Sequence, residues 1–324
     1  MLHALSYKTK QFLLVLIKLS IVVAAFYFIA HKLFENDQLD FRVFTHFLFK
    51  NDVFSAKNIL FLLFLSIFNW FFEILKWNTL VNSIQPLSFK KALEQSLAAL
   101  TPSLITPNRI GDYGAKAIYY NPSQRKKILL LNVFGNMAQM TATVIFGVLG
   151  LFFFMKRFGL ELNYLKFFSG TAILILIVLF IGFGSKQQWF KIKGLSANKI
   201  SHFIKNIQQG IKIKVFIYST LRYMIFSFQF YVLLYIFKTE LTYMEAMIFI
   251  TTMYFLASVI PSIFIFDVLI KGSVAVYVFG FLGVDDLTVL SIITLMWLLN
   301  FVLPSIFGSY YVLNFKLLKN SNTI

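Results

Sequence analysis

Apolar segments that approach the length of a membrane-spanning helix recur along this sequence, and they limit what the chain can fold into. A helix needs about 20 predominantly apolar residues to cross the hydrocarbon core. Only 13% of the residues are charged, about half the share of a soluble domain. The sequence therefore predicts an all-α, polytopic integral membrane protein. We expect six full spans, at about 12–30, 58–78, 128–154, 166–184, 215–237 and 287–315.

The net charge of +17 would suggest nucleic acid for a soluble protein, but loops rich in Lys and Arg favour the cytoplasmic side of a membrane. The basic residues precede the first span, follow the second and fourth spans, and end the chain. With these clusters inside, six spans place both termini in the cytoplasm. We therefore expect a multi-pass protein of the plasma (inner) membrane and no nucleic-acid partner. The outward loops then lie around Glu161, Glu240, Asp285 and Asp286.

The sequence has none of the common catalytic, nucleotide or metal signatures. It contains no cysteine, and its four histidines are scattered. It has no phosphate-binding loop, no HExxH and no GxSxG. We therefore expect no cofactor, no metal and no catalytic residue, and the interpretation leans away from an enzyme.

Two further segments, 87–120 and 241–283, begin and end on one side of the membrane in this topology. Each has an apolar helix of about 19 residues, then a proline and a polar or glycine-bearing return. This pattern predicts two re-entrant helical hairpins. Broken backbone at membrane depth needs protein or water around it.

The two hairpins resemble each other in sequence. With an offset of 154 and no gap, 87–107 aligns with 241–261, so that Pro107 matches Pro261. After one inserted residue, Asp112 and Lys116 match Asp267 and Lys271. The charge pattern gives the halves opposite orientations, which is typical of transporters built from inverted repeats. The expected divisions are repeat 1 at about 11–154, a basic cytoplasmic loop at about 185–214, and repeat 2 at about 166–315, within one domain covering 1–324.

The stretch LITPNRIGDYGAKA carries the strongest candidate site. In a helix, Arg109, Asp112 and Lys116 share one face, and Gly111 and Gly114 would let another helix or a lipid headgroup approach closely. The functional interpretation is that the cations attract an anionic headgroup, which Asp112 helps to orient. The alternative is an internal ion-pair cluster near the interface.

Other polar residues extend this candidate site. Asp267 and Lys271 repeat the acid–base pair, and Arg222 is either a second phosphate ligand or a partner of Asp267 or Glu73. Hinge roles are predicted for Pro107, Gly111, Gly114, Pro261 and Gly272.

Three amides and one charged pair have simpler interpretations. Asn132, Asn136 and Gln139 form a polar stripe that either makes interhelical hydrogen bonds or lines a cavity. Glu73 and Lys76, three residues apart, are interpreted as a pair that reaches to the interface. The segment 196–214 has helical apolar spacing among lysines, which predicts an interfacial amphipathic helix or a purely topological loop.

The stretch TPNRIGDYGAKA resembles the transmembrane, flippase-like domain of the lysylphosphatidylglycerol synthase family. Members carry a Pro-Gly-Arg-x-Gly-Glu-like motif, and here Asn108 replaces the glycine and Asp112 the glutamate. A second family segment, Pro-x-x-Gly-Gly-x-Gly-x-x-Glu, is represented by PSIFIFDVLIKGS, which keeps Pro261 and Asp267 but lacks the glycine pair.

The resemblance implies translocation of a charged lipid between leaflets, either an anionic or aminoacylated phospholipid or a polyprenyl-linked precursor. Membrane lipids are then the partners, with a homodimer or biosynthetic partner proteins left open. Some members add a soluble aminoacyl transferase, which we do not expect here because the sequence stops soon after its last span. The alternative is a membrane-embedded enzyme or accessory subunit in lipid or lipid-linked glycan synthesis.

Overall fold

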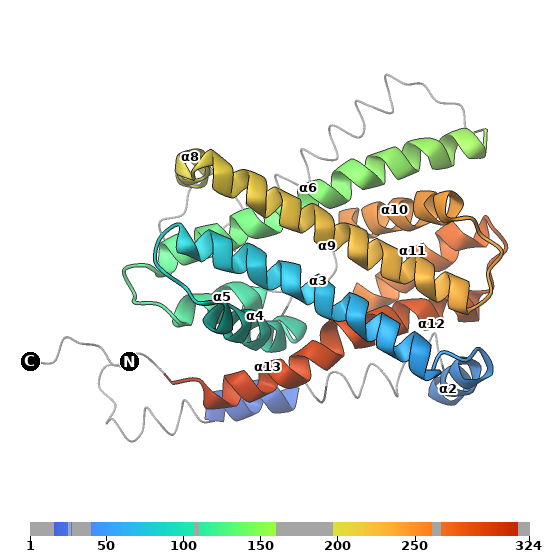
Figure 1. Ribbon diagram of the computed structural model, residues 1–324, viewed down its shortest axis with the longest axis horizontal. Coiled ribbons are helices and arrows are strands. Elements are labelled where there is room, and N and C mark those ends of the chain that lie inside the picture. The colour runs from blue at the N-terminus through green and yellow to red at the C-terminus, as the bar shows by residue number, and fades with distance from the viewer. Residues whose placement is uncertain are drawn as a thin grey trace, which may run out of the picture.

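The computed structural model describes residues 16–24, 27, 40–106, 110–159, 197–260 and 267–316, with the backbone alone at 197–201 and 267–270. Throughout these residues the regular elements are helices, joined by short turns (Figure 1). They are α2 (Phe41–Lys50), α3 (Ala56–Asn82), α4 (Phe89–Leu104), α5 (Ile110–Ile118), α6 (Arg125–Arg157), α8 (Ala197–Asn206), α9 (Gln209–Ile236), α10 (Tyr243–Val259), α11 (Asp267–Gly280), α12 (Asp286–Trp297) and α13 (Leu303–Asn314). A π-helical turn, Leu298–Val302, joins α12 to α13.

Three of the described helices are long and apolar enough to cross a membrane: α3, α6 and the continuous α12–α13 unit. They cover the expected spans at 58–78, 128–154 and 287–315. Helix α9 is as long but carries Lys212, Lys214 and Arg222, and it falls outside this set. The expected span at 166–184 lies outside the described residues, and the one at 12–30 lies largely outside them.

Helices α3 and α9 form the central pair and run in opposite directions (Figure 1). The direction follows from their hydrogen bonds. Gln229, late in α9, donates to the carbonyl oxygen of Leu62, early in α3, at 3.0 Å. Arg222, further back in α9, contacts Glu73, further along α3. The pair therefore crosses the molecule as an antiparallel unit against which the other helices pack.

Glycines allow close helix contacts on both sides of this pair. A Cβ atom on Gly308 of α13 would lie 2.2 Å from the carbonyl oxygen of Leu97 in α4. A Cβ atom on Gly147 of α6 would lie 2.2 Å from Cβ of Phe255 in α10. Small residues let helix backbones approach closely in membranes. Helix α4 thus packs on α13, and α10 on α6.

Each expected hairpin segment contains two helices that pack against each other, α4 with α5 and α10 with α11. The residues that cap α4 and α10 occupy the matched positions of the sequence alignment. The hydroxyl of Ser88 accepts the Lys91 amide at 3.4 Å, and the hydroxyl of Thr242 accepts the Glu245 amide at 3.4 Å. An N-terminal hydroxyl satisfies a backbone amide that the helix leaves free. The depth of these helices in a membrane stays a prediction.

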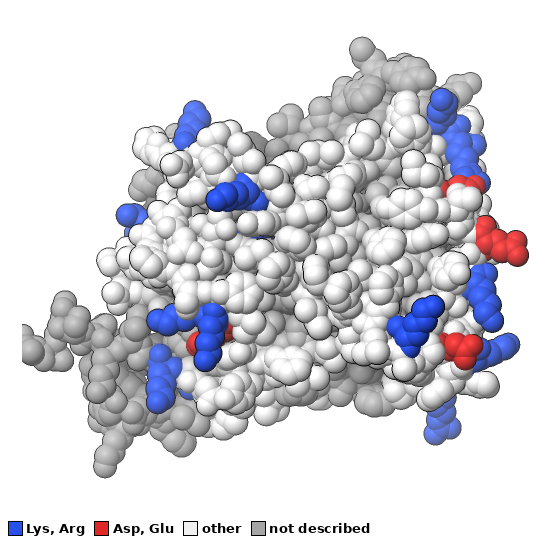
Figure 2. Space-filling view, in the orientation of Figure 1, with Lys and Arg blue, Asp and Glu red and all other residues white. Residues whose placement is uncertain are grey.

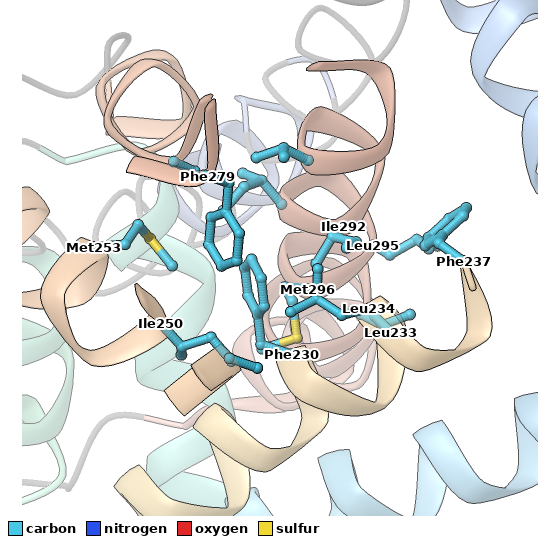
Figure 3. Close-up of a cluster of buried hydrophobic side chains, with 14 of the residues drawn as sticks. Phe230, Leu233, Leu234, Phe237, Ile250, Met253, Phe279, Ile292, Leu295 and Met296 are labelled. Atoms are coloured by element: carbon cyan, nitrogen blue, oxygen red, sulfur yellow. The ribbon is translucent and has the colours of Figure 1, made fainter. Parts of the chain in front are cut away.

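Apolar side chains form two main clusters. The larger one joins α2, α9, α10, α11 and α12, and its centre includes Phe230 stacked on Phe279 at 5.5 Å between ring centroids (Figure 3). The second cluster lies where α3 ends and α6 begins, and it includes Ile207 just after α8. Phe203 of α8 packs against it. The apolar face of the predicted amphipathic segment is therefore covered, in part, by protein.

The charged residues lie at the two ends of the helices, with an uncharged belt between them on the face seen in Figure 2. The end where α3 stops and α6 and α9 start is basic. Its charged residues include Lys90, Lys91, Glu94, Arg125, Lys126, Lys127, Lys205, Lys212 and Lys214. The opposite end mixes acids and bases. Its charged residues are Asp40, Arg42, Lys50, Asp52, Lys57, Lys156, Arg157, Lys238, Glu240, Glu245, Asp285 and Asp286.

Candidate functional site

A buried ionic cluster lies where α3, α5, α6 and α9 meet. Its centre is Glu73 of α3, whose side chain is 11% exposed. One carboxylate oxygen lies 2.6 Å from Nζ of Lys76 and also contacts the guanidinium of Arg222. The other oxygen lies 4.0 Å from Nζ of Lys116. One carboxylate thus joins three cations from three helices.

Asp112 of α5 is the second acid of this ionic cluster. Its carboxylate lies 3.1 Å from Nζ of Lys116, one helical turn further along α5. The amide of Asn132 on α6 donates to Asp112 at 2.6 Å, and its oxygen accepts from Lys116 at 3.2 Å. The Lys116 ammonium also lies 4.7 Å from the ring centroid of Trp77, a cation–π contact. Charge, amide and ring together fix the Lys116 ammonium in place.

A chain of amides continues from the ionic cluster towards the middle of the long helices. Nε of Arg222 donates to the side-chain oxygen of Asn69 at 3.0 Å. The amide of Asn69 donates to Asn300 at 2.8 Å, and the amide of Asn300 donates to Gln229 at 2.8 Å. The amide of Gln229 donates to Ser66 at 2.9 Å. The buried polar groups therefore form one connected network across α3, α9 and the π-helical turn.

The π-helical turn at Leu298–Val302 is explained by Pro304. Proline has no amide hydrogen, so it leaves the carbonyl oxygen of Asn300, four residues earlier, without its helical donor. The indole of Trp70 donates to this oxygen at 3.0 Å. Interruptions of this kind are frequent at functional sites. The turn also directs the Asn300 side chain towards Asn69 and Gln229.

The amide network lies midway along its helices. Arg222 is midway along α9, and Asn300 is midway along the candidate span Asp286–Asn314. At about 1.5 Å of rise per residue, Arg222 is roughly 20 Å from either end of α9. In a helix that crosses a membrane, an ionisable group at such a place is costly and commonly marks a substrate or ion pathway.

Among the residues that the structure describes, the ionic cluster carries one more positive than negative charge, from Lys76, Lys116 and Arg222 against Glu73 and Asp112. Lys76 Nζ is buried and makes its ion contact without a well-aligned hydrogen bond to any described group. A buried charge is favourable only when it is paired and hydrogen-bonded. The ionic cluster can therefore accept one further anionic group.

The structure brings several predicted site residues together. Asp112 and Lys116 form the expected pair, and Arg222 joins the same cluster through Glu73, one of its two predicted acid partners. The polar stripe of α6 makes interhelical hydrogen bonds. Asn132 bonds Asp112, and Asn136 donates to the hydroxyl of Tyr113 at 2.8 Å. Gln139 donates to the carbonyl oxygen of Ser219 at 3.3 Å.

Other predicted residues fall elsewhere. Pro107, Arg109 and Pro261 lie outside the described residues, and so does the side chain of Asp267. Lys271 is partly buried on α11, which packs against α10 and α12.

The predicted hinge glycines differ in their surroundings. A Cβ atom on Gly111 would lie 2.5 Å from the carbonyl oxygen of Pro102, so α5 does approach α4 closely there. Gly114 is exposed, and a Cβ atom added to it would have no described atom within 4 Å. Gly272 is buried on α11.

The interpretation of Glu73 and Lys76 as a pair reaching to the interface is wrong. Lys76 is only 2% exposed, and Glu73 binds cations of two other helices. Sequence reasoning also missed Asn69 and Asn300. For Asn300 the sequence did contain a signal: it lies four positions before Pro304 inside an apolar span, and the proline leaves the carbonyl oxygen of Asn300 without its usual helical donor.

Comparison with known proteins gives one match. The family model described as lysylphosphatidylglycerol synthase TM region matches residues 14–308, which include every residue of the ionic cluster. No curated protein and no solved structure matches the chain.

Proposed function

Because this chain belongs to the family of the lysylphosphatidylglycerol synthase TM region, we propose that it moves a charged lipid between the two leaflets of its membrane. The headgroup would bind at the buried ionic cluster while the acyl chains stay in the bilayer. The observation that carries the proposal is the unbalanced positive charge of Lys76, Lys116 and Arg222, buried where α3, α5 and α9 meet. This charge favours an anionic group such as a lipid phosphate.

The helix arrangement supports two inverted halves around this site. With the offset of 154, α3 corresponds to α9, and these two helices run antiparallel. The pairs of packed helices correspond as well. Gly308 of α13 meets Thr101 of α4, and Gly147 of α6 meets Phe255 of α10. Phe255 is the counterpart of Thr101 in the same alignment. The short helix of each half, α4 or α10, therefore packs against a long helix of the other half.

The ionic cluster is partly exposed, and a buried apolar cluster lies between it and the mixed-charge end of the molecule. Asp112 and Arg222 keep 18% and 19% of their side chains exposed. Towards the mixed-charge end, Phe230, Met253 and Phe279 are fully buried in the larger apolar cluster (Figure 3). We infer that this apolar cluster separates when the site opens to that side, as alternating access requires.

The distribution of charge supports the orientation. Lys and Arg favour the cytoplasmic side, so the basic end, with Arg125 and the start of α9, would face the cytoplasm. The mixed-charge end, with Glu240 and Asp285, would face outward. In a bacterial inner membrane, a lipid made in the cytoplasmic leaflet would then enter at the basic end.

A Lys76→Met variant tests the proposal without leaving a buried charge unpaired. It removes one buried cation at nearly constant volume and leaves the ionic cluster neutral, so the protein should remain folded. Reconstituted protein would be assayed with a fluorescent phosphatidylglycerol and an impermeant quencher. We expect Lys76→Met, and likewise Arg109→Ala, to abolish most of the movement.

The matched control is Lys57→Met, since Lys57 is exposed at the start of the same helix. It should move lipid at the wild-type rate. Wild-type rates for Lys76→Met would show that the ionic cluster does not bind the headgroup.

A further inference from the structure

Buried oxygen atoms with few described hydrogen-bond partners gather where α6, α9 and α10 meet. They are Gln139 Oε1 on α6, the hydroxyls of Ser219, Tyr223 and Ser227 on α9, and the hydroxyl of Tyr254 on α10. The hydroxyls of Tyr223 and Ser227 interact with each other. We call this group the polar seam. Ser219 and Ser227 are fully buried, and Tyr223 is 4% exposed. The seam is separate from the ionic cluster and its amide network, which use Arg222 and Gln229 on another face of α9.

Contacts hold the members of the polar seam close together. Ser219, Tyr223 and Ser227 are spaced by four residues, so they follow one face of α9. The amide nitrogen of Gln139 donates to the carbonyl oxygen of Ser219, which places Gln139 Oε1 beside the start of the row. The rings of Tyr223 and Tyr254 lie 6.3 Å apart between centroids. The row extends over about 12 Å of helix.

Buried hydroxyls elsewhere in the described residues differ: Ser96, Thr252 and Ser291 also have no described partner, whereas others bond on their own helix. Thr251 donates to the carbonyl oxygen of Met247 at 2.7 Å, and Thr294 donates to that of Leu290 at 2.8 Å. The serines of the seam do not, and a Gln or Tyr side chain is too long to do so. Gln139 Oε1 and the hydroxyls of Ser219 and Tyr254 still lack a described partner, and leaving such buried polar atoms unpaired lowers the free energy of unfolding. The seam therefore needs an occupant that both donates and accepts hydrogen bonds.

The chemistry of the polar seam favours water as its occupant. Its members are neutral, so a bound ion would have no countercharge among them. Their linear spacing also differs from the compact oxygen cage that metal cations require. A buried water takes two to four polar partners. Hydroxyls one helical turn apart can supply them to successive waters.

We propose that the polar seam binds a file of ordered water molecules through the middle of the protein. Because Arg222 precedes Tyr223 on α9, the file runs beside the ionic cluster and keeps the centre of the molecule hydrated. The proposal does not depend on which lipid the ionic cluster binds.

Radiolytic hydroxyl labelling of the protein in nanodiscs tests the proposal, because radicals form on waters beside buried side chains. The internal control is Met253, which is fully buried in the apolar cluster and precedes Tyr254 in α10. Its thioether is intrinsically more reactive than a phenol. We expect labelling of Tyr223 several-fold faster than that of Met253. Equal or faster labelling of Met253 would overturn the proposal.

A second measurement uses Ser219→Ala, Ser227→Ala and Tyr223→Phe. In a hydrated seam, each change removes a water ligand, so labelling of Tyr254 falls several-fold and the thermal midpoint stays level or drops. In a dry seam, Ser219→Ala removes an unpaired polar atom and raises the midpoint. A raised midpoint for Ser219→Ala with unchanged labelling of Tyr254 would contradict the proposal.

Discussion

Replacing Glu73 by glutamine should destabilise the protein strongly. The substitution leaves Lys76, Lys116 and Arg222 facing the single acid Asp112. One ion contact at 4 Å is worth about 4 kcal/mol at an effective dielectric constant near 20. The net loss is smaller than this, because burying a neutral amide costs less desolvation free energy than burying a carboxylate. Breaking a buried pair by removing one partner costs about 3–5 kcal/mol, and we expect a loss in this range.

The rescue experiment makes this prediction specific. Adding Lys76→Met to Glu73→Gln restores the original excess of one positive charge, so the double variant should be more stable than the sum of the single changes by about 0.5–3 kcal/mol. Unfolding in mixed micelles, followed by tryptophan fluorescence, gives the free energies for the full cycle. Strict additivity, or no loss in Glu73→Gln alone, would refute the inferred balance of charges.

Three further outcomes are expected. Gly308→Ala should cost about 1–3 kcal/mol in the same assay because it forces helices apart, whereas Gly210→Ala, with open space around it, should cost nothing. Trp70→Phe leaves the carbonyl oxygen of Asn300 unpaired and should cost about 1–3 kcal/mol, and an unchanged free energy would refute the role of the indole. The Arg42 and Val43 amides lower the pKa of Asp40, so its contribution to α2 is full above pH 3.8 and lost as the pH falls through the lowered pKa. Hydrogen exchange at the start of α2 should therefore become faster as the pH falls in the wild type, and this pH dependence should be absent in Asp40→Asn.

Local sequence spacing predicted the elements that depend on neighbouring residues. Apolar length predicted the helices that became α3, α6 and α12–α13, and the four-residue spacing of Asp112 and Lys116 predicted their ion pair. The interhelical role of Asn132, Asn136 and Gln139 was one of two interpretations of the stripe. These features follow from helix periodicity alone.

Contacts between distant segments were harder to predict. Glu73 belongs to the site because α9 packs antiparallel to α3 and brings Arg222 to it, over 149 residues of sequence. Asn300 joins the network through the irregular turn before Pro304. Periodicity within one helix does not reveal which helix lies opposite, so the depth and partners of such residues come only from packing.

The orientation of the two halves is the claim on which the site and its access depend, and accessibility of single cysteines tests it most directly. The chain has no cysteine, so Ser123→Cys and Glu240→Cys can be labelled without background. Both positions are exposed, one at the basic end before α6 and the other between α9 and α10. With an impermeant maleimide, we expect Ser123→Cys to react only from the cytoplasmic side and Glu240→Cys only from the opposite side. Labelling of both from the same side would contradict the inverted arrangement and the site proposed between its halves.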